Sequence, residues 1–189
     1  MSLLVNHVSK WAFIHVPKTA GTSISYVLNQ YPETENIASH QPVRFISDLQ
    51  EYFIFSFVRN PFTRTLSSYF HYQRKYKKEI SFENFLKTTN LNHLWMLPQN
   101  YYLKSKNDKV EISFIGKYEN LKKDVSKVFH RLGIDKNIPH LNRHSIYDKH
   151  PNLKQENYYK SFYTEDWMKD WVRERYEDDF KIFNYGMDI

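Results

Sequence analysis

The segment PKTAGTS, residues 17–23, contains residue types that bind anions. It lies between a short apolar run and apolar residues at helical spacing, which predicts the order strand, tight loop, helix. Such a loop presents backbone N–H groups, and the next helix adds the positive end of its dipole. Gly21 permits close approach of the backbone, Thr22 and Ser23 add hydroxyl groups, and Lys18 adds a cation. We predict an anion-binding loop here, the alternative being an ordinary turn capped by Thr22.

A second candidate segment is RNPFTRTLSSY, residues 59–69. Arg59 follows a strongly apolar run, and Ser67 lies two turns into the helix expected after it. An arginine fork together with a hydroxyl group can grip a terminal phosphate. Arg64 is expected to have a structural role, pairing with an acidic neighbour. The alternative for the whole segment is a capped helix with a solvated arginine.

Neither segment has the pattern of a nucleoside-triphosphate loop. In GxxxxGK[ST] the lysine follows the last glycine, whereas Lys18 precedes Gly21 by three positions. The second apolar run ends in Arg59 and not in an acidic residue that would hold magnesium. These differences disfavour a metal-dependent kinase, and we expect no metal site.

The elements that must position these residues follow from hydrophobic periodicity. Strands are predicted over 11–16, 52–58 and 112–115, and they alternate with helices. This alternation predicts an α/β fold with a parallel sheet and right-handed crossovers. Ligands of such sheets bind at the carboxyl ends of the strands, so Lys18 and Arg59 are expected on one rim. With 189 residues, we expect a single domain, 1–189.

Capping residues also predict where several helices begin and end. Asn60 can cap a helix that has Pro61 at its first position. Asn120 can cap a later helix, which Gly133 is expected to end. Residues 164–166 are expected to open the last helix.

At this point the chain resembles a known family. PKTAGTS and RNPFTRTLSSY resemble the 5′-phosphosulfate and 3′-phosphate binding motifs of the sulfotransferase superfamily, and the carbohydrate sulfotransferases are the most similar branch. The resemblance implies a P-loop-like, three-layer α/β domain with a central, mainly parallel sheet flanked by helices. It also implies 3′-phosphoadenosine 5′-phosphosulfate (PAPS) as donor, 3′-phosphoadenosine 5′-phosphate (PAP) as product, and no metal.

The resemblance carries over to individual donor-binding residues. GKYENLKKD, residues 116–124, resembles a segment in which a tyrosine flanks the adenine, and HLNRHS, residues 140–145, resembles a loop that closes over the donor. The implied donor-binding residues are Lys18, Thr19, Ala20, Gly21, Thr22, Ser23, Arg59, Ser67, Tyr118 and Arg143.

Two residues are expected to carry the chemistry. By the resemblance, Lys18 meets the negative charge that grows on the bridging oxygen of the leaving phosphate. The acceptor hydroxyl needs a base with a pKa near neutrality, and His40 follows the first helix where related enzymes carry a catalytic histidine. His71 and Glu119 are the alternatives for this base.

The acceptor is less well defined. Arg44 and the run RKYKK at 74–78 suit an acidic glycan, although charge runs are more often solvated helix faces. Trp95 and Gln99 resemble a segment that lines the acceptor cleft in relatives, and Trp95 is equally suited to a core. We expect a hydroxylated carbohydrate acceptor, acidic if the basic residues contact it.

Composition sets the remaining expectations. The net charge of +6 suits an anionic partner, and the lack of cysteine excludes disulfides and thiolate metal sites. No signal peptide or membrane span is visible, so a cytoplasmic protein of a bacterium or virus is expected. No nucleic-acid binding motif is found. Three function classes stay open: a sulfotransferase, a P-loop-like nucleotide or nucleoside kinase, and an inactive sulfotransferase-like nucleotide-binding protein.

Overall fold

The computed structural model describes residues 3–38, 42, 49, 51–104, 112–139 and 157–189. They belong to two compact units, and each is described by itself. The sheet unit comprises Met1–Arg59 and Gln99–Asn142, and the helical unit comprises Asn60–Pro98 and Arg143–Ile189. That the chain acts as a single domain stays a prediction.

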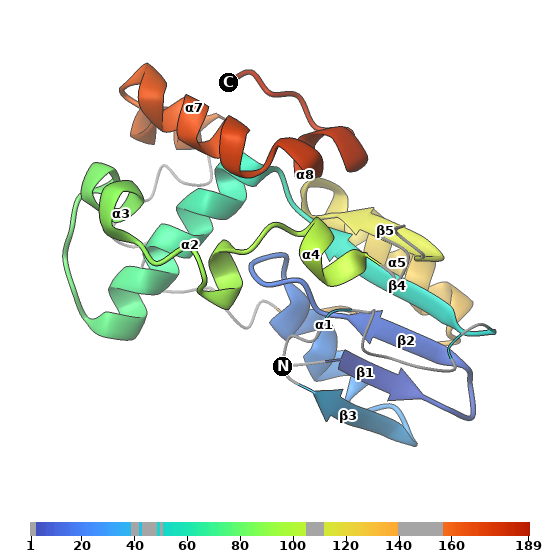
Figure 1. Cartoon of the computed structure of the whole chain (residues 1–189). Helices are drawn as coiled ribbons and strands as arrows, with labels where there is room; N and C mark the ends of the chain where they lie inside the picture. The colour runs from blue at the N-terminus through green and yellow to red at the C-terminus, as the bar shows by residue number, and fades with distance from the viewer. Residues whose placement is uncertain (1–2, 39–41, 43–48, 50, 105–111, 140–156) are drawn as a thin grey trace. The chain divides into compact units, whose positions relative to one another are not determined.

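The sheet unit is built on five strands in the order β3-β1-β2-β4-β5, so that β3 and β5 form the edges (Figure 1). Strand β2 pairs in parallel with β4, and β4 in parallel with β5, whereas β1 is antiparallel to both β2 and β3. The strands are β1 (Leu3–Asn6), β2 (Trp11–Ile14), β3 (Thr34–Ala38), β4 (Phe53–Val58) and β5 (Phe114–Lys117).

The α/β class is confirmed, but the sheet is mixed. The expectation of a mainly parallel sheet holds only for β2, β4 and β5, the three strands that the apolar runs predicted. Strand β1 was not expected. A turn over residues 7–10, in which Lys10 has a φ of 48°, joins β1 to β2. So short a connection can only join antiparallel strands, because parallel strands need a long crossover.

Helices α1 and α5 pack against one face of the sheet. A single buried cluster joins Phe13 and Phe55 of the strands to Ile24 of α1 and Val125 of α5. The helices of this unit are α1 (Gly21–Leu28), α4 (Asn100–Leu103), η3 (Tyr118–Asn120) and α5 (Leu121–Arg131). Each covering helix follows a strand of the parallel part: α1 comes after β2, and α5 comes after β5.

The expected end of α5 is confirmed. Gly133 has a φ of 68°, the left-handed conformation that glycine adopts without a Cβ penalty. Its N–H donates to the carbonyl of His130, and the N–H of Ile134 donates to that of Phe129. This pair of bonds is the Schellman motif, and the apolar Ile134 and Phe129 share the core cluster. At the other end, α5 begins after Asn120 as predicted, although the Asn120 side chain makes no capping hydrogen bond.

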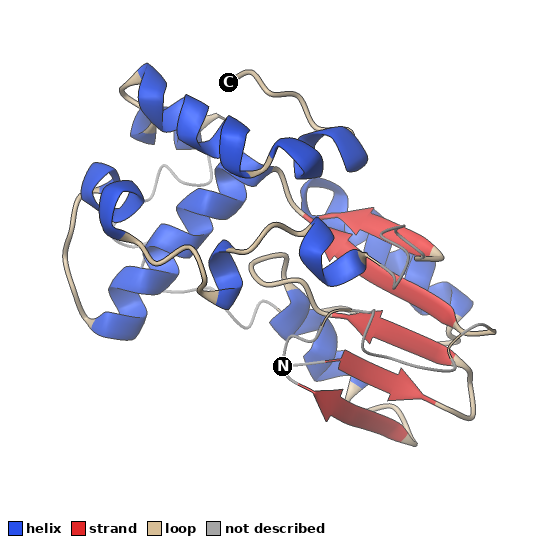
Figure 2. Ribbon diagram, in the orientation of Figure 1, coloured by secondary structure: helices blue, strands red, loops and turns tan. Residues whose placement is uncertain are grey.

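The described residues of the helical unit form helices only (Figure 2). Asn60 accepts the N–H of Phe62 at 2.9 Å with Pro61 at the first helical position, so the predicted start of α2 is confirmed. The helices are α2 (Pro61–Tyr76), α3 (Phe82–Thr88), η2 (Leu94–Met96), η5 (Tyr158–Phe162), α7 (Asp166–Arg175) and α8 (Glu177–Ile182).

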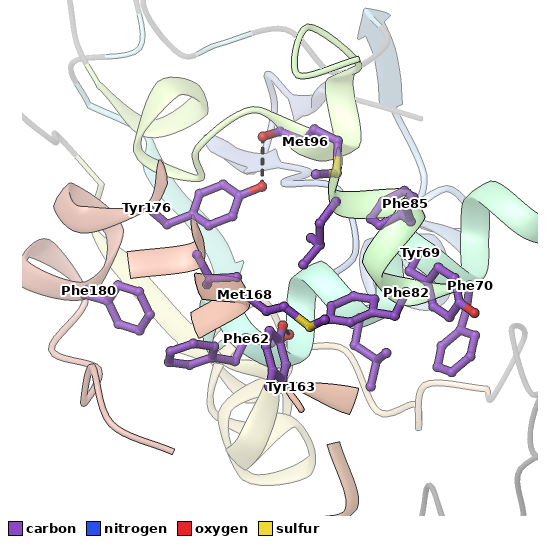
Figure 3. Close-up of a cluster of buried hydrophobic side chains, with 13 residues drawn as sticks. Phe62, Tyr69, Phe70, Phe82, Phe85, Met96, Tyr163, Met168, Tyr176 and Phe180 are labelled. Atoms are coloured by element: carbon purple, nitrogen blue, oxygen red, sulfur yellow. Dashed lines mark hydrogen bonds between the residues drawn. The ribbon is translucent and has the colours of Figure 1, made fainter. Parts of the chain in front are cut away.

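The helical unit has an aromatic core whose buried tyrosine hydroxyls donate to backbone carbonyls (Figure 3). The hydroxyl of Tyr176 donates to the carbonyl of Met96 at 3.0 Å, and that of Tyr163 donates to the carbonyl of Phe62 at 2.7 Å. Arg64 is buried in this unit, where it donates to the carbonyl of Leu97 at 2.9 Å and lies over the ring of Tyr176. These contacts agree with the structural role expected for Arg64, while its pairing with an acidic neighbour stays a prediction.

Candidate functional site

The loop between β2 and α1 has an unusual backbone. Lys18 and Ala20 have φ values of 71° and 69°, in the left-handed region that residues with a Cβ avoid at a cost of about 1–2 kcal/mol each. The buried hydroxyl of Thr19, between them, donates to the carbonyl of Val16 at 2.8 Å and ties the loop to the end of the strand. Conformations of this kind cluster at ligand sites, where the surrounding structure holds them.

Gly21 is required by a close contact with the preceding strand end. A Cβ at this position would lie 1.9 Å from Cδ2 of His15, much closer than any non-bonded contact. His15 is buried and stacks on Phe13, with the ring centroids 6.1 Å apart, so its ring cannot easily give way. The loop therefore lies tight against the imidazole, and only glycine fits at the first residue of α1.

The start of α1 makes this loop suitable for binding an anion. The first turn of a helix has N–H groups without a carbonyl partner in the helix, and the helix dipole places positive charge there. Ala20, in the left-handed conformation, is followed directly by the right-handed residues of α1, a backbone pattern that turns successive N–H groups toward an anion. Thr22 and Ser23 lie in this first turn. The arrangement can bind a phosphate or a sulfate group.

Arg59 lies at the same edge of the sheet as this loop. It follows β4, which pairs in parallel with β2, with Trp11 beside Phe53 and Ile14 beside Ser56. The carboxyl ends of the two strands therefore meet, as the sequence predicted for Lys18 and Arg59. A long hydrogen bond of 3.5 Å joins Nη1 of Arg59 to the carbonyl of Lys18.

Tyr118 lies against the arginine. It follows β5, whose last residue, Lys117, pairs with Val58 directly before Arg59. The guanidinium carbon of Arg59 is 4.0 Å from the centroid of the Tyr118 ring. A cation over a tyrosine face is stabilised by about 0.5–2 kcal/mol, depending on solvent exposure. The structure thus brings together Lys18, Arg59 and Tyr118, which lie far apart in the sequence.

The main chain of Arg59 is held by the side chain of Gln99. Oε1 of Gln99 accepts the N–H of Arg59 at 2.8 Å, and Nε2 of Gln99 donates to the carbonyl of Arg59 at 2.8 Å. Gln99 is fully buried. The structure therefore places this residue, predicted to contact the acceptor, against the predicted phosphate-binding arginine.

Asp124 fixes the strand end that carries Tyr118. Its Oδ2 accepts the N–H of Lys117 at 3.0 Å, and its Oδ1 binds Nζ of Lys127 at 2.9 Å. Burial alone would raise the pKa of the Asp124 carboxyl, but the N–H of Lys117 and the ammonium of Lys127 outweigh burial and lower that pKa. The carboxylate is thus stabilised in its charged form next to the candidate site.

Other predicted residues lie in the helical unit. Ser67 is half-buried on α2. Trp95 is half-buried on η2, where His93 stacks on its ring at 4.5 Å and His71 meets it edge-on at 4.9 Å. Nζ of Lys75 lies 4.5 Å from the ring centroid of Trp95. Trp95 therefore packs against the aromatic core of the helical unit and is bordered by Lys75 and the two histidines.

Three predicted residues, His40, Arg44 and Arg143, lie outside the described residues, and their roles stay predictions. Glu119, an alternative base, is exposed beside Tyr118. Within the described ranges, no three His, Asp or Glu side chains gather into a group able to hold a metal ion. Among the helices that the structure describes, none is long and apolar enough to span a membrane.

Sequence reasoning missed the contacts of three residues near this site: His15, the carboxamide of Gln99 and Asp124. Each is a polar side chain that is buried. For His15, its position as the one polar residue inside the apolar run 11–16 was the available signal. No local sequence pattern predicts the contact between Gln99 and Arg59, because the two residues are 40 positions apart.

Comparisons with known proteins agree with the geometry. The sequence model of the sulfotransferase family matches residues 1–186. A carbohydrate sulfotransferase 14 of Danio rerio is 26% identical over 98% of this chain, which spans 62% of that relative's length. An uncharacterized protein of Archaeoglobus fulgidus is 36% identical over 46% of this chain and 72% of its own length. No solved structure matches significantly. The matched range includes the loop before α1, Arg59 and Tyr118, and the chain belongs to the sulfotransferase family.

Proposed function

We propose that this protein is a PAPS-dependent sulfotransferase that transfers a sulfuryl group to a hydroxyl of a carbohydrate. The observation that carries the proposal is the meeting of two anion-binding elements at one edge of the sheet. The loop from Lys18 to Gly21 follows β2, and Arg59 follows the adjacent parallel strand β4. Family membership supports the reaction class.

The residues present suit a donor that carries two separated anionic groups. The loop and the first turn of α1 suit the 5′-phosphosulfate, because N–H groups, two hydroxyls and the Lys18 ammonium belong to them. Arg59 suits the 3′-phosphate, since a guanidinium fork matches phosphate oxygens. Tyr118, half-buried beside Arg59, offers an aromatic ring for the adenine.

Lys18 is proposed as the catalytic cation. When the acceptor oxygen bonds to sulfur, the bond between sulfur and the bridging oxygen breaks, and that oxygen takes up negative charge. An ammonium group placed there stabilises the transition state more than the bound donor, which raises turnover. No metal ion is needed in this scheme.

His40 is proposed as the base that takes the proton of the acceptor hydroxyl. The proposal comes from its position after the first helix in the sequence. A neutral imidazole is available near its ordinary pKa of about 6.5. His40→Ala should lower turnover by roughly two to four orders of magnitude with little change in donor affinity. Near-normal turnover of His40→Ala would show that His40 is not the base, and Glu119 or His71 would then be tested for that role.

A carbohydrate acceptor is supported from two sides. The relative from Danio rerio is named a carbohydrate sulfotransferase. In the helical unit, Trp95 has an aromatic ring bordered by Lys75 and two histidines, a combination that suits a sugar with acidic groups. Arg44 is a further acceptor-binding candidate from the sequence.

Thermal unfolding with a panel of nucleotides tests the proposal. PAP at about 100 times its Kd should stabilise the native state by about 2.7 kcal/mol, which for a chain of this size raises the Tm by roughly 5–10 °C. AMP should give a smaller rise, and Arg59→Ala should reduce the response to PAP to that of AMP. Stabilisation by ATP with magnesium, and none by PAP, would favour the kinase alternative.

A further inference from the structure

The carboxamide of Gln99 behaves like a short piece of neighbouring strand. On the β2 side of β4, pairing ends at Ile14 and Ser56, three residues before Arg59. Beyond this point Gln99 supplies one acceptor and one donor, each 2.8 Å from its partner on Arg59. Two residues that exchange both bonds in this way reproduce the hydrogen-bonded pair of an antiparallel ladder.

Both polar atoms of the buried Gln99 side chain are used in its contact with Arg59. Gln99 is 0% exposed, and a buried carboxamide is costly unless its polar atoms are hydrogen-bonded. Both its oxygen and its nitrogen have a partner on the same residue. The two bonds fix the peptide groups on either side of the Arg59 Cα, and so they fix the direction in which the side chain leaves the backbone.

The guanidinium has a second support. Its carbon lies 4.0 Å from the Tyr118 ring centroid, and Nη1 makes the long bond to the carbonyl of Lys18. The main chain and the side chain of Arg59 are thus held independently, the first by Gln99 and the second by Tyr118. An arginine preorganised at both ends loses less conformational entropy when it binds an anion.

We infer that Gln99 is a positioning residue that orients Arg59 for the 3′-phosphate of the donor. The inference rests on the proposed function, because it takes Arg59 as the group that reads this phosphate. It differs from a role for Gln99 in contacting the acceptor. A positioning role changes the preference for PAP over AMP, whereas an acceptor contact changes only the Michaelis constant for the acceptor.

The test compares the Kd values of PAP and AMP by calorimetry for the wild type, Arg59→Ala and Gln99→Met. Methionine keeps the length of the side chain and removes both hydrogen bonds. We expect Gln99→Met to weaken PAP about tenfold and to change AMP by less than about twofold, as a misplaced bidentate contact would. If the variant does not fold, Gln99→Asn replaces it, because it keeps a carboxamide in the buried site but is one methylene too short to hold both main-chain groups of Arg59.

Asn6→Leu is the matched control. Asn6 is a buried carboxamide in the same unit, and it also makes two main-chain hydrogen bonds, to the carbonyl of Pro32 at 2.8 Å and from the N–H of Ser9 at 2.7 Å. Its loss should lower the Tm without altering the ratio of the two Kd values. Amide exchange of the Arg59 N–H should become faster in Gln99→Met and stay slow in Asn6→Leu.

The outcomes separate the inference from the proposed function. If the wild type does not prefer PAP over AMP, the proposed function fails and the inference fails with it. If the wild type prefers PAP, Arg59→Ala abolishes the preference and Gln99→Met retains it, then the proposed function stands and the positioning role of Gln99 is overturned.

Discussion

The guanidinium of Arg59 lies 4.0 Å over the ring of Tyr118, and this contact joins two strand ends of the sheet. Arg59 follows β4, and Tyr118 follows the neighbouring strand β5, whose last residue pairs with Val58. Because the strands are parallel, both residues leave the sheet at the same edge. The donor site that we propose is therefore built from consecutive strand ends, β2, β4 and β5.

Tyr118→Leu should weaken PAP more than AMP. Removal of the aromatic ring takes away a stacking surface for the adenine of both nucleotides, but only PAP also needs the arginine that the ring supports. The loss of the cation–π contact corresponds to a roughly 2- to 30-fold additional change in the Kd of PAP. Tyr118→Phe, which keeps the ring, should bind both nucleotides nearly as the wild type does. Calorimetry on the three proteins measures these Kd values. Equal losses of affinity for PAP and AMP in Tyr118→Leu would show that Tyr118 does not support PAP binding through Arg59.

Lys18→Ala should depress turnover by roughly 100- to 1,000-fold while it changes the Kd of the donor only a few-fold, because the charge it meets develops in the transition state. Alanine also carries a Cβ, so the left-handed backbone at position 18 is equally strained in the variant. Lys10→Ala is the control: Lys10 also has a positive φ, 48°, and lies before the opposite end of β2, where it pairs with Glu51.

Steady-state and single-turnover rates of sulfuryl transfer test this role for Lys18. An unchanged turnover with only a raised Michaelis constant for the donor would contradict it. The same assays with a chelator present should proceed at the full rate. Activity that strictly requires magnesium would instead favour the kinase alternative.

Much of this edge was predictable because the strands that form it are the strongly apolar ones. The run 52–58 is almost wholly apolar, as suits a strand buried on both faces, and it forms β4. The helix starts at Asn60 and the end at Gly133 were also predictable, since each depends on a local backbone requirement.

The other half of the sheet was not predictable by the same means. Strand β1 is four residues long, and its apolar residues Leu3, Leu4 and Val5 are too few to show a period. Strand β3, TENIA, is largely polar because it lies at the edge, where Glu35 and Asn36 are exposed. Since these two strands were missed, the antiparallel part of the sheet was missed with them.

Contacts between residues far apart in the sequence could be predicted only where the fold class fixes them. Lys18 and Arg59 could be placed together because both follow strands of a parallel sheet. The contact of Gln99 with Arg59 depends on the path of the chain between β4 and α4, which no local pattern specifies.

Gly21→Ala should destabilise the protein and abolish donor binding. The new Cβ would lie 1.9 Å from the His15 ring, so either the imidazole or the loop must move. Overpacking of this kind costs about 1–3 kcal/mol, and a displaced loop would lose its alignment with the anion. Gly186→Ala is the control, because a Cβ there meets nothing within 4 Å. Thermal unfolding and PAP binding of the two variants measure the difference, and normal PAP affinity in Gly21→Ala would show that the loop does not hold the donor.

The stability that Asp124 contributes should depend on pH. Its folded-state pKa is lowered, because the N–H of Lys117 and the ammonium of Lys127 outweigh the opposing effect of burial. A lowered carboxyl pKa contributes stability that is present above the unfolded-state value of about 3.9 and is lost as pH falls through the folded value. Asp124→Ala should therefore be about 1–3 kcal/mol less stable than the wild type at neutral pH, the usual cost of leaving the Lys117 N–H without its partner.

That difference should shrink as pH falls from about 5 toward 2, because the wild-type carboxylate becomes protonated and weakens its own hydrogen bond. Asp135→Asn, at an exposed aspartate after the same helix, should give parallel curves with the wild type. Urea unfolding at a series of pH values measures both. Since Asp124 holds the strand end that carries Tyr118, PAP affinity should also fall in Asp124→Ala. A stability difference that stays constant down to pH 2 would show that the charge of Asp124 contributes nothing to this strand end.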